Sequence, residues 1–454
     1  MRLNSVAAAV HGELQRLRNS PRVFLLGLAS LALRLCGMAV TFGTGVILAR
    51  MWGPGDFGVY GLVISLSGLF VNIVLLGTPQ LAVRDFAIRS AHGCWSEIRD
   101  RARRFQFSSM VASLLLLAAA GLVAFWRGGF LGIASRDLLT GAVLTAFVAQ
   151  VALLSSSLRG IGQMGRGQFM DILGRPATLF AILVPAVLIG HGVSVSEVLY
   201  IQLSVAIVAF AVSQVWFGRA TLQADHHERL VTGPEARPAW LKVALPLGMI
   251  DILRQLDGTY GLIIIGWLSP GDELGLYRVA LSCGALLTLP LSIVHNILAP
   301  EISRLSHSGD RVALQAVLDR VSRSMSAIAV AMAAGVILLG KPLLVFAFGE
   351  AYAGAWAPLS VIALTQLSFS LFGMGPILLA MAGQERALTL IYTIGVAVGA
   401  SVAVALLLSG FGGVGGALAQ FVSITFVAVL SDRTAYRQLG VHTSIIRWRW
   451  AERQ

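Results

Sequence analysis

The chain is short of charge: only 12% of its 454 residues are Asp, Glu, Lys or Arg, and 56% are hydrophobic. A soluble domain carries about 25% charged residues, so this composition excludes a large water-soluble domain. Cysteine is also scarce. Cys36 and Cys283 lie in apolar segments and Cys94 in a basic one. Three such isolated residues form neither a disulfide framework nor a metal cluster, and we expect no cofactor.

Long apolar segments recur along the whole chain, and each approaches the ~20 residues that cross a ~30 Å hydrocarbon layer as a helix. They are continuous and not alternating, which excludes a β-barrel. We predict an all-α polytopic membrane protein with about twelve spans. Their predicted ranges are 23–48, 57–80, 106–126, 138–158, 172–190, 197–218, 241–268, 274–299, 324–348, 356–381, 387–408 and 412–431.

Basic residues orient these spans. With the N-terminus in the cytoplasm, 27 of the 34 Lys and Arg residues fall in cytoplasmic segments, and four fall on the opposite side. Cytoplasmic loops of membrane proteins carry such an excess of positive charge, so we predict that both termini are cytoplasmic. The net charge of +12 is then explained by topology and by contact with anionic lipids, and it does not indicate nucleic-acid binding.

A short motif occurs twice, about half the chain apart. Pro54-Gly55-Asp56-Phe57-Gly58-Val59-Tyr60 recurs with one insertion as Pro270-Gly271-Asp272-Glu273-Leu274-Gly275-Leu276-Tyr277. Both copies follow the first span of a set of six, which predicts two pseudo-symmetric six-helix lobes around a central cavity that holds the substrate. The predicted parts are a cytoplasmic segment at 1–22, lobes at 23–218 and 241–431, a linker at 219–240 and a basic tail at 432–454.

The sequence from Leu48 to Tyr60, LARMWGPGDFGVY, resembles the hallmark loop of Wzx-type oligosaccharide flippases. These are polysaccharide biosynthesis proteins of the multidrug/oligosaccharidyl-lipid/polysaccharide (MOP) exporter superfamily. Further similarity lies in Leu158–Gln163, Phe348–Tyr352, Gly383–Ala387 and Gly412–Ala417. Trp52 stands where the family usually has Leu. The similarity extends over roughly residues 22–430 and does not specify a substrate.

This resemblance implies two lobes around a cationic cavity that opens alternately to each side of the bacterial inner membrane. It implies export of an undecaprenyl-diphosphate-linked oligosaccharide for cell-surface polysaccharide such as lipopolysaccharide. Polymerase or ligase proteins of the same pathway are then possible partners.

Three charged residues interrupt the apolar segment 241–268. Asp251, Arg254 and Asp257 are spaced by three, so they share one face of a helix. A charge inside a bilayer costs at least about 2.5 kcal/mol and generally faces protein or water. The two aspartates are candidate sites for a driving ion, H⁺ or Na⁺. They are equally candidates for fixed counterions of Arg254.

Arg34 interrupts the first span, and Arg254 the first span of the second half. Arginine suits a diphosphate because its planar guanidinium donates two parallel hydrogen bonds. We therefore predict that the two arginines form a diphosphate clamp. The alternative is that they lock the lobes by pairing with Asp251 and Asp257.

Three further polar residues are weaker substrate-binding candidates. Arg278 lies near the outer end of its span and could simply reach the interface. Asn296, next to His295, could line the inner half of the cavity. Asn72 could bind sugar, although hydrogen bonding between helices is the commoner role.

Two segments resemble nucleotide-binding motifs in sequence but lack the surrounding structure that those motifs require. The run from Gly335 to Lys341 matches most of a P-loop, but Pro342 replaces Ser/Thr inside a membrane segment. The run from Gly160 to Gly165 matches GxGxxG without a preceding strand. No nucleophile and base are paired, so we predict no catalytic residues and no enzyme activity.

The sequence alone leaves two other functions possible. One is a cation-coupled multidrug antiporter of the same superfamily, which the acidic residues would suit. The other is a non-transporting membrane scaffold of envelope polysaccharide assembly, for which intramembrane charges would have no use.

Overall fold

A computed structural model describes residues 21–190, 192–224, 240–269, 271–308 and 310–445. In these ranges the chain is helical apart from connections and one hairpin of β1 (Gly129–Phe130) and β2 (Ile133–Ala134). The helices up to residue 224 are α2 (Pro21–Leu75), α3 (Thr78–His92), α4 (Trp95–Arg127), α5 (Ser135–Gly160), α6 (Met164–Gln168), the π-helix η1 (Phe169–Gly174), α7 (Arg175–Leu188) and α8 (Val195–Ala224).

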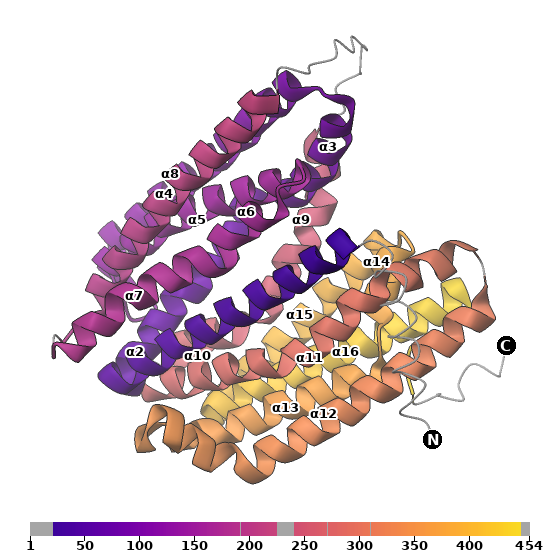
Figure 1. Ribbon diagram of the computed structural model, residues 1–454. Helices are drawn as coiled ribbons and strands as arrows, with labels where there is room; N and C mark the ends of the chain where they lie inside the picture. The colour runs from indigo at the N-terminus through magenta and orange to yellow at the C-terminus, as the bar shows by residue number, and fades with distance from the viewer. Residues whose placement is uncertain (1–20, 191, 225–239, 270, 309, 446–454) are drawn as a thin grey trace. The chain divides into compact units, whose positions relative to one another are not determined.

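The later helices follow the interval that lies outside the described residues. They are α9 (Trp240–Asp257), α10 (Tyr260–Leu268), α11 (Asp272–Ser308), α12 (Arg311–Phe348), the 3₁₀ helix η3 (Glu350–Ala355), α13 (Trp356–Phe372), α14 (Gly375–Met381), α15 (Glu385–Leu408) and α16 (Gly412–Leu439). Figure 1 shows these elements along the chain.

Ten stretches of the described residues are long and apolar enough to cross a membrane. One of them, Ala29–Leu75, contains two of the predicted spans, because α2 is broken at Gly53, where φ is +77°. Pro54 follows, and its ring prevents a regular helix from continuing through this point. The predicted span 241–268 supplies one more crossing in two pieces, α9 and α10. The polytopic all-α prediction with about twelve spans is confirmed.

Three predicted spans are less regular than their hydropathy indicated. α9 ends at Asp257 and α10 begins at Tyr260, with Thr259 between them donating its hydroxyl to the Gln255 carbonyl. The span 356–381 breaks at Gly373, whose φ is +79°, and the span 172–190 begins in η1. Apolar composition identifies the segment that lies in the membrane, but it does not report local breaks in a helix.

The described chain forms two compact units. The C-terminal unit comprises Trp52–Leu62 and the described part of Leu253–Gln454, and the N-terminal unit comprises the described parts of Ala7–Met51 and Val63–Ile252. This division by contacts does not follow the predicted lobe boundaries, since both α2 and α9 contribute to both units. The functional lobes 23–218 and 241–431 stay a prediction. Most of 1–22, 219–240 and the end of 432–454 lies outside the described residues.

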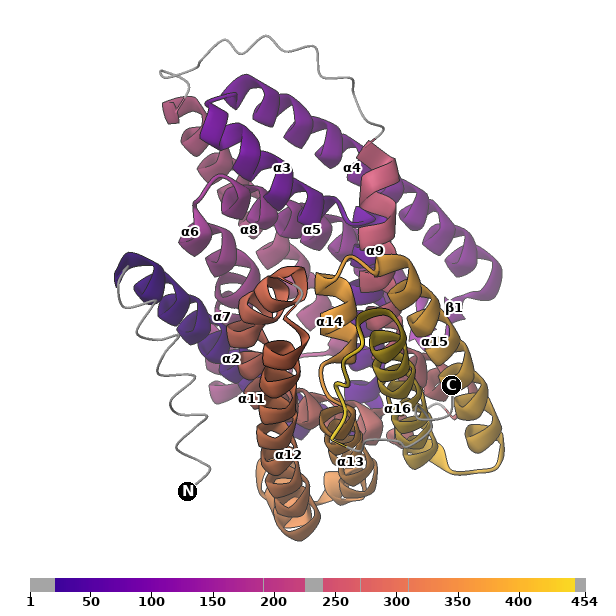
Figure 2. The same ribbon diagram turned by 90° about the vertical axis from the view of Figure 1, so that its right-hand side faces the viewer.

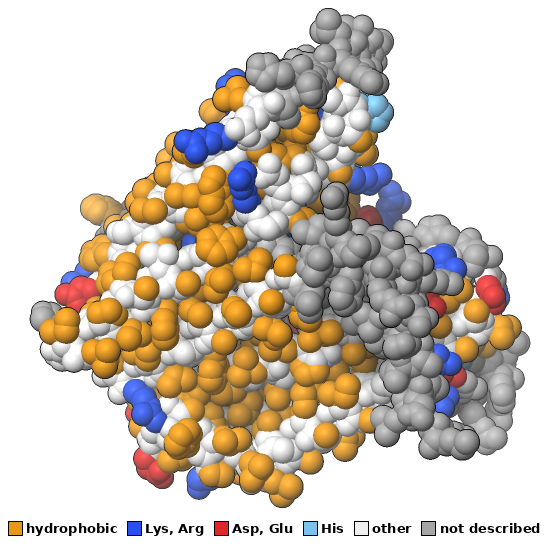
Figure 3. Space-filling view, in the orientation of Figure 1, with side chains coloured by type: hydrophobic (Ala, Val, Ile, Leu, Met, Phe, Trp, Pro, Cys, Tyr) orange, Lys and Arg blue, Asp and Glu red, His pale blue; other side chains and the backbone are white. Residues whose placement is uncertain are grey.

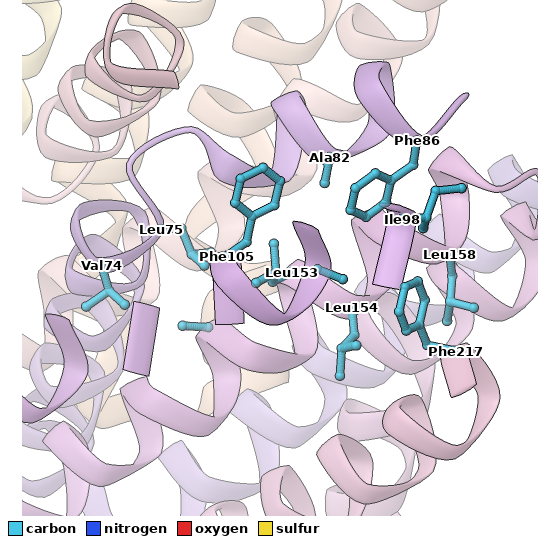
Figure 4. Packing of buried hydrophobic residues seen from close by; sticks show 12 residues of the cluster. Val74, Leu75, Ala82, Phe86, Ile98, Phe105, Leu153, Leu154, Leu158 and Phe217 are labelled. Atoms are coloured by element: carbon cyan, nitrogen blue, oxygen red, sulfur yellow. The ribbon is translucent and has the colours of Figure 1, made fainter. Parts of the chain in front are cut away.

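A buried apolar cluster holds α3, α4, α5 and α8 of the N-terminal unit together (Figure 4). Phe86 of α3 stacks on Phe105 of α4 with ring centroids 6.2 Å apart. Leu153 and Leu154 of α5 and Phe217 of α8 complete the contact. The apolar side chains of α4 beyond this cluster are mostly exposed, which is expected of a helix that faces lipid.

In the C-terminal unit, α16 packs against both α13 and α15 (Figure 2). The chain after α16 turns at Gly440, and Thr443 and Ser444 are buried. The Asp432 carboxylate accepts hydrogen bonds from the backbone N–H groups of Thr443 and Ser444. Hydrophobic side chains cover much of the face of the molecule drawn in Figure 3, as a bilayer requires.

Candidate functional site

Asp251 of α9 belongs to the N-terminal unit. Its carboxylate accepts a hydrogen bond from the side-chain amide of Gln80 in α3. One turn earlier, α9 also lies close to the turn before α3, where a Cβ on Gly248 would lie 2.6 Å from the backbone nitrogen of Gly77. Asp251 therefore has a partner on a neighbouring helix of its own unit.

Asp257, two turns further along α9, belongs to the C-terminal unit and is 8% exposed. It accepts a hydrogen bond from the Ser423 hydroxyl of α16. Tyr260 is buried beside this pair, since a Cβ on Gly399 would contact both the Tyr260 ring and the Ser423 side chain. Burial of a carboxylate is costly unless hydrogen bonds satisfy it, and this site supplies at least one.

Arg254 lies between the two aspartates in sequence and is exposed. Within the described residues no ion pair joins it to Asp257, whose recorded partner is Ser423. Arg254 interacts electrostatically with Tyr392 of α15 in the same unit. Spacing by three places the side chains on one helix face, but each of the three has its own surroundings.

The other predicted clamp residue, Arg34 of α2, has basic neighbours in the N-terminal unit. Its charge and that of Asp171 both act on Arg159 in the last turn of α5. Arg175, the first residue of α7, donates from Nη2 to the Asp171 carboxylate at 3.2 Å. Arg159 donates from Nη2 to the Ser156 hydroxyl at 2.7 Å. The three arginines and one aspartate form what we term the Arg34 cluster.

The π-helix η1 shapes this cluster. Asp171 lies in it, and a Cβ on Gly37 of α2 would lie 2.9 Å from the Cγ2 atom of Ile172. Glycine at position 37 thus lets the backbones of α2 and η1 approach one turn after Arg34. Single turns of π-helix are rare and are frequent at functional sites.

The Arg34 cluster has more positive than negative charge, with one carboxylate for three guanidinium groups. In the part of the chain that the structure describes, the buried Nε–H groups of Arg159 and Arg175 have no hydrogen-bond partner. Unpaired buried donors are costly, and an anion with several acceptor oxygens would satisfy them. Among the same residues no group of His, Cys, Asp and Glu is arranged to hold a metal ion.

The remaining sequence candidates have separate locations. The Arg278 side chain covers Gly61, where an added Cβ would lie 2.6 Å from its Cδ atom. Asn72 donates from Nδ2 to the Gly68 carbonyl of its own helix at 3.1 Å. The side chain of Asn296 lies outside the described residues. Substrate contact by these residues stays a prediction.

Sequence reasoning missed the contributions of Arg159, Asp171 and Arg175. It assigned all three to a cytoplasmic segment at 159–171, extended to Arg175 at the start of the span 172–190, and used the arginines only as markers of topology. Two signals were available: the spacing of four between Asp171 and Arg175, which suits an ion pair on a helix, and the family-like motif that contains Arg159.

Comparison with known proteins identifies one matching family. The family described as polysaccharide biosynthesis protein matches residues 27–306. No curated protein sequence matches the chain.

Solved structures share the fold at low sequence identity. An inward-facing multidrug resistance MATE family transporter of the MOP superfamily is 13% identical, covers 91% of this chain and 98% of its own, and has a TM-score of 0.66. The lipid II flippase MurJ in an inward closed conformation is 14% identical, with 91% and 87% covered and a TM-score of 0.62. A MOP superfamily transporter from Pyrococcus furiosus, described as having a binding pocket of reverse polarity, is 15% identical, with 91% and 95% covered and a TM-score of 0.62.

Proposed function

Because the chain belongs to the polysaccharide biosynthesis protein family, we propose that it is a flippase for an undecaprenyl-diphosphate-linked oligosaccharide. It would act in the bacterial inner membrane, with both termini cytoplasmic, and supply cell-surface polysaccharide assembly. The observation that carries this proposal is the Arg34 cluster. A cluster with excess positive charge on membrane-embedded helices suits an anionic group that cannot cross hydrocarbon unaided.

The diphosphate would bind first at the Arg34 cluster. Its oxygens would accept from Arg34 and from the unpaired Nε–H groups of Arg159 and Arg175. Asp171 would hold Arg175 in position through their ion pair and limit repulsion between the arginines. Arg254 would take part on the C-terminal half, as the sequence predicts, when the cavity opens to the other side.

The fold supports a transport cycle. A MATE transporter and the lipid II flippase MurJ share it, so one architecture serves both drug efflux and movement of a lipid-linked sugar. We propose alternating access of the two lobes. The energy would come from H⁺ or Na⁺ bound at Asp257 or Asp251, and a polymerase or ligase would receive the product.

The alternative is a cation-coupled multidrug antiporter. Buried Asp257 would suit a cationic drug or its coupling ion, and the fold is shared with a multidrug transporter. The Arg34 cluster argues against a cationic substrate, because like charges repel more strongly in a medium of low dielectric constant. A non-transporting scaffold would gain nothing from the unpaired buried Nε–H groups of Arg159 and Arg175.

The test measures lipid-linked oligosaccharide on the cytoplasmic leaflet of cells that carry each variant as the only copy. Arg34→Ala and Arg159→Gln should each cause accumulation, and Arg34→Lys should restore export in part because an ammonium lacks the bidentate fork. Arg104→Gln, at an exposed position of α4, is the matched control and should export normally.

Correct insertion of every variant is checked by its abundance in the membrane. Normal export by the Arg34→Ala, Arg159→Gln double variant would show that the Arg34 cluster does not bind the diphosphate. Loss of drug resistance without accumulation of lipid-linked oligosaccharide would favour the antiporter.

A further inference from the structure

A pocket of about 400 Å³ lies within the N-terminal unit, between α4, α5 and α8. It is separate from the Arg34 cluster and shares no residue with it. Its apolar lining includes Leu117, Phe147 and Phe210. Phe107 and Met110 at its rim are 71% and 58% exposed, on a helix with little of its apolar surface buried inside the protein. The pocket therefore opens toward lipid.

One end of the pocket is polar. The side-chain amide of Gln106 donates to Oε1 of Gln214 at 2.9 Å. Gln150 donates to the Gln106 carbonyl at 3.2 Å and to the Ser109 hydroxyl at 3.0 Å, which fixes the orientation of its amide. Within the described residues the amide nitrogen of Gln214 has no hydrogen-bond partner, so its N–H groups remain available at the pocket.

The length of the pocket matches one leaflet. From Gln106 to Leu117 a helix rises about 16 Å, close to half of a hydrocarbon layer that is about 30 Å thick. The polar end coincides with the point where α4 changes from basic to apolar. Arg103 lies one turn before Phe107 on the same face as the pocket, and its side chain is 79% exposed.

We propose that this pocket binds one acyl chain of an anionic phospholipid. The chain would lie along α4 from the three glutamines to Leu117. Its ester carbonyl would accept from the amide nitrogens of Gln106 and Gln214, and its phosphate would face Arg103. An available N–H donor at the edge of hydrocarbon is costly, and the ester carbonyl is the acceptor found at that depth of a bilayer.

The experiment uses the full-length protein in vesicles that contain phosphatidylglycerol with a diazirine in one acyl chain. After illumination, cross-linked residues are mapped by mass spectrometry. Labelling should concentrate on Phe107–Leu117 and Ala142–Gln150 and should saturate. Ala146→Phe, which fills the pocket, should lower labelling by about tenfold, the effect of roughly 1.4 kcal/mol of lost binding. Ala119→Phe, at an exposed position of α4 outside the pocket, should leave it unchanged.

Two further comparisons test the polar end. Unlabelled phosphatidylglycerol with ester-linked chains should compete better than its ether-linked counterpart, and Gln214→Leu should remove that difference. Phosphatidylglycerol should compete better than phosphatidylcholine, and Arg103→Gln should reduce that preference.

Labelling of the wild-type protein that never saturates would overturn the proposal, whatever the folding of the variants. Equal competition by ester and ether lipids, or by the two headgroups, would do the same. Displacement of the probe by a polyprenyl phosphate and not by phosphatidylglycerol would assign the pocket to the carrier lipid instead. None of these outcomes depends on oligosaccharide export. Failure of the lipid-binding proposal would therefore not contradict the proposed function, and failure of the proposed function would not contradict lipid binding.

Discussion

Gly58 and Gly275, the equivalent glycines of the two copies of the repeated motif, pack against each other through their backbones. A Cβ on Gly58 would lie 2.7 Å from the backbone nitrogen of Gly275, and a Cβ on Gly275 would collide with the Pro54 carbonyl. Real Cβ atoms essentially never approach so closely. The repeat that was visible in sequence is therefore also a contact in space, and glycine is required at both positions because no side chain fits.

Gly275→Ala should lower the free energy of unfolding by about 1–3 kcal/mol, the usual cost of forcing extra volume into a packed site. Gly335→Ala is the matched control, since a Cβ there meets nothing within 4 Å and the residue is helical. That control should be neutral or slightly stabilising, by about 0.5–1 kcal/mol. Thermal unfolding in detergent measures both, and equal shifts for the two variants would contradict the backbone contact.

Asp85 of α3 joins two arginines at the basic end of the N-terminal unit. Arg101 donates to it from Nη1 at 3.0 Å and Arg89 from Nε at 3.2 Å, and the Asp85 side chain is 18% exposed. Asp85→Asn should therefore destabilise the protein by about 1.5–3 kcal/mol, the range for hydrogen bonds to charged groups.

Asp100→Asn serves as the control for Asp85→Asn. Asp100 pairs with Arg103 at 4.0 Å, and both side chains are largely exposed. Exposed ion pairs contribute about 0–1 kcal/mol, so this variant should unfold close to the wild-type temperature. A loss as large as that of Asp85→Asn would show that net charge, and not the partly buried ion pairs of Asp85, sets the effect.

The fold was largely predictable because hydropathy indicates which segments cross the membrane and basic residues indicate which side each loop faces. Apolar segments locate the helices, and the motif around Gly58 and Gly275 revealed the repeat. The break at Gly373, inside the predicted span 356–381, was not predicted, whereas Gly53 lies in the predicted connection between spans 23–48 and 57–80; both glycines have positive φ. A glycine inside an apolar segment is compatible with a continuous helix as well as a break, so the residue type alone does not decide.

The site was less predictable because contacts between helices decide it. Arg34 was selected for its position in an apolar segment, but its neighbours Arg159 and Asp171 come from segments more than 100 residues away. The pairing of Asp257 with Ser423 is of the same kind. Periodicity places residues on a face of one helix, and it does not identify which helix lies opposite.

Topology can be tested with reporter fusions at loops on each side. Fusions at Arg99, Ala220, Arg311 and the C-terminus should report a cytoplasmic location, because those segments carry most of the basic residues. Fusions at Asp56, Arg136, Asp272 and Ala353 should report an external one. Alkaline phosphatase and green fluorescent protein fusions give opposite readouts and control for expression. An external location of Ala220 or Arg311 would overturn the twelve-span arrangement.

The role of Asp257 can be decided by double-mutant cycles with its two candidate partners. If Asp257 were the counterion of Arg254, Asp257→Asn would be tolerated once Arg254 was also neutralised, because no charge would be left uncompensated. Asp257 accepts from Ser423 and forms no recorded ion pair with Arg254 within the described residues. Arg254→Gln should therefore give no rescue, and the Arg254–Asp257 interaction energy should be within about 0.5 kcal/mol of zero.

The cycle with Ser423 should behave differently. Ser423→Ala and Asp257→Asn remove the two ends of one buried hydrogen bond, so their effects on unfolding should be coupled by about 0.5–3 kcal/mol. Ser401→Ala is the control, since Ser401 is exposed on α15 and bonds only within its own helix. Export and unfolding are both measured for every variant. If adding Arg254→Gln to Asp257→Asn restores export, Asp257 is a counterion of Arg254. If Asp257 carries the driving ion, every Asp257 variant that remains folded should lose export.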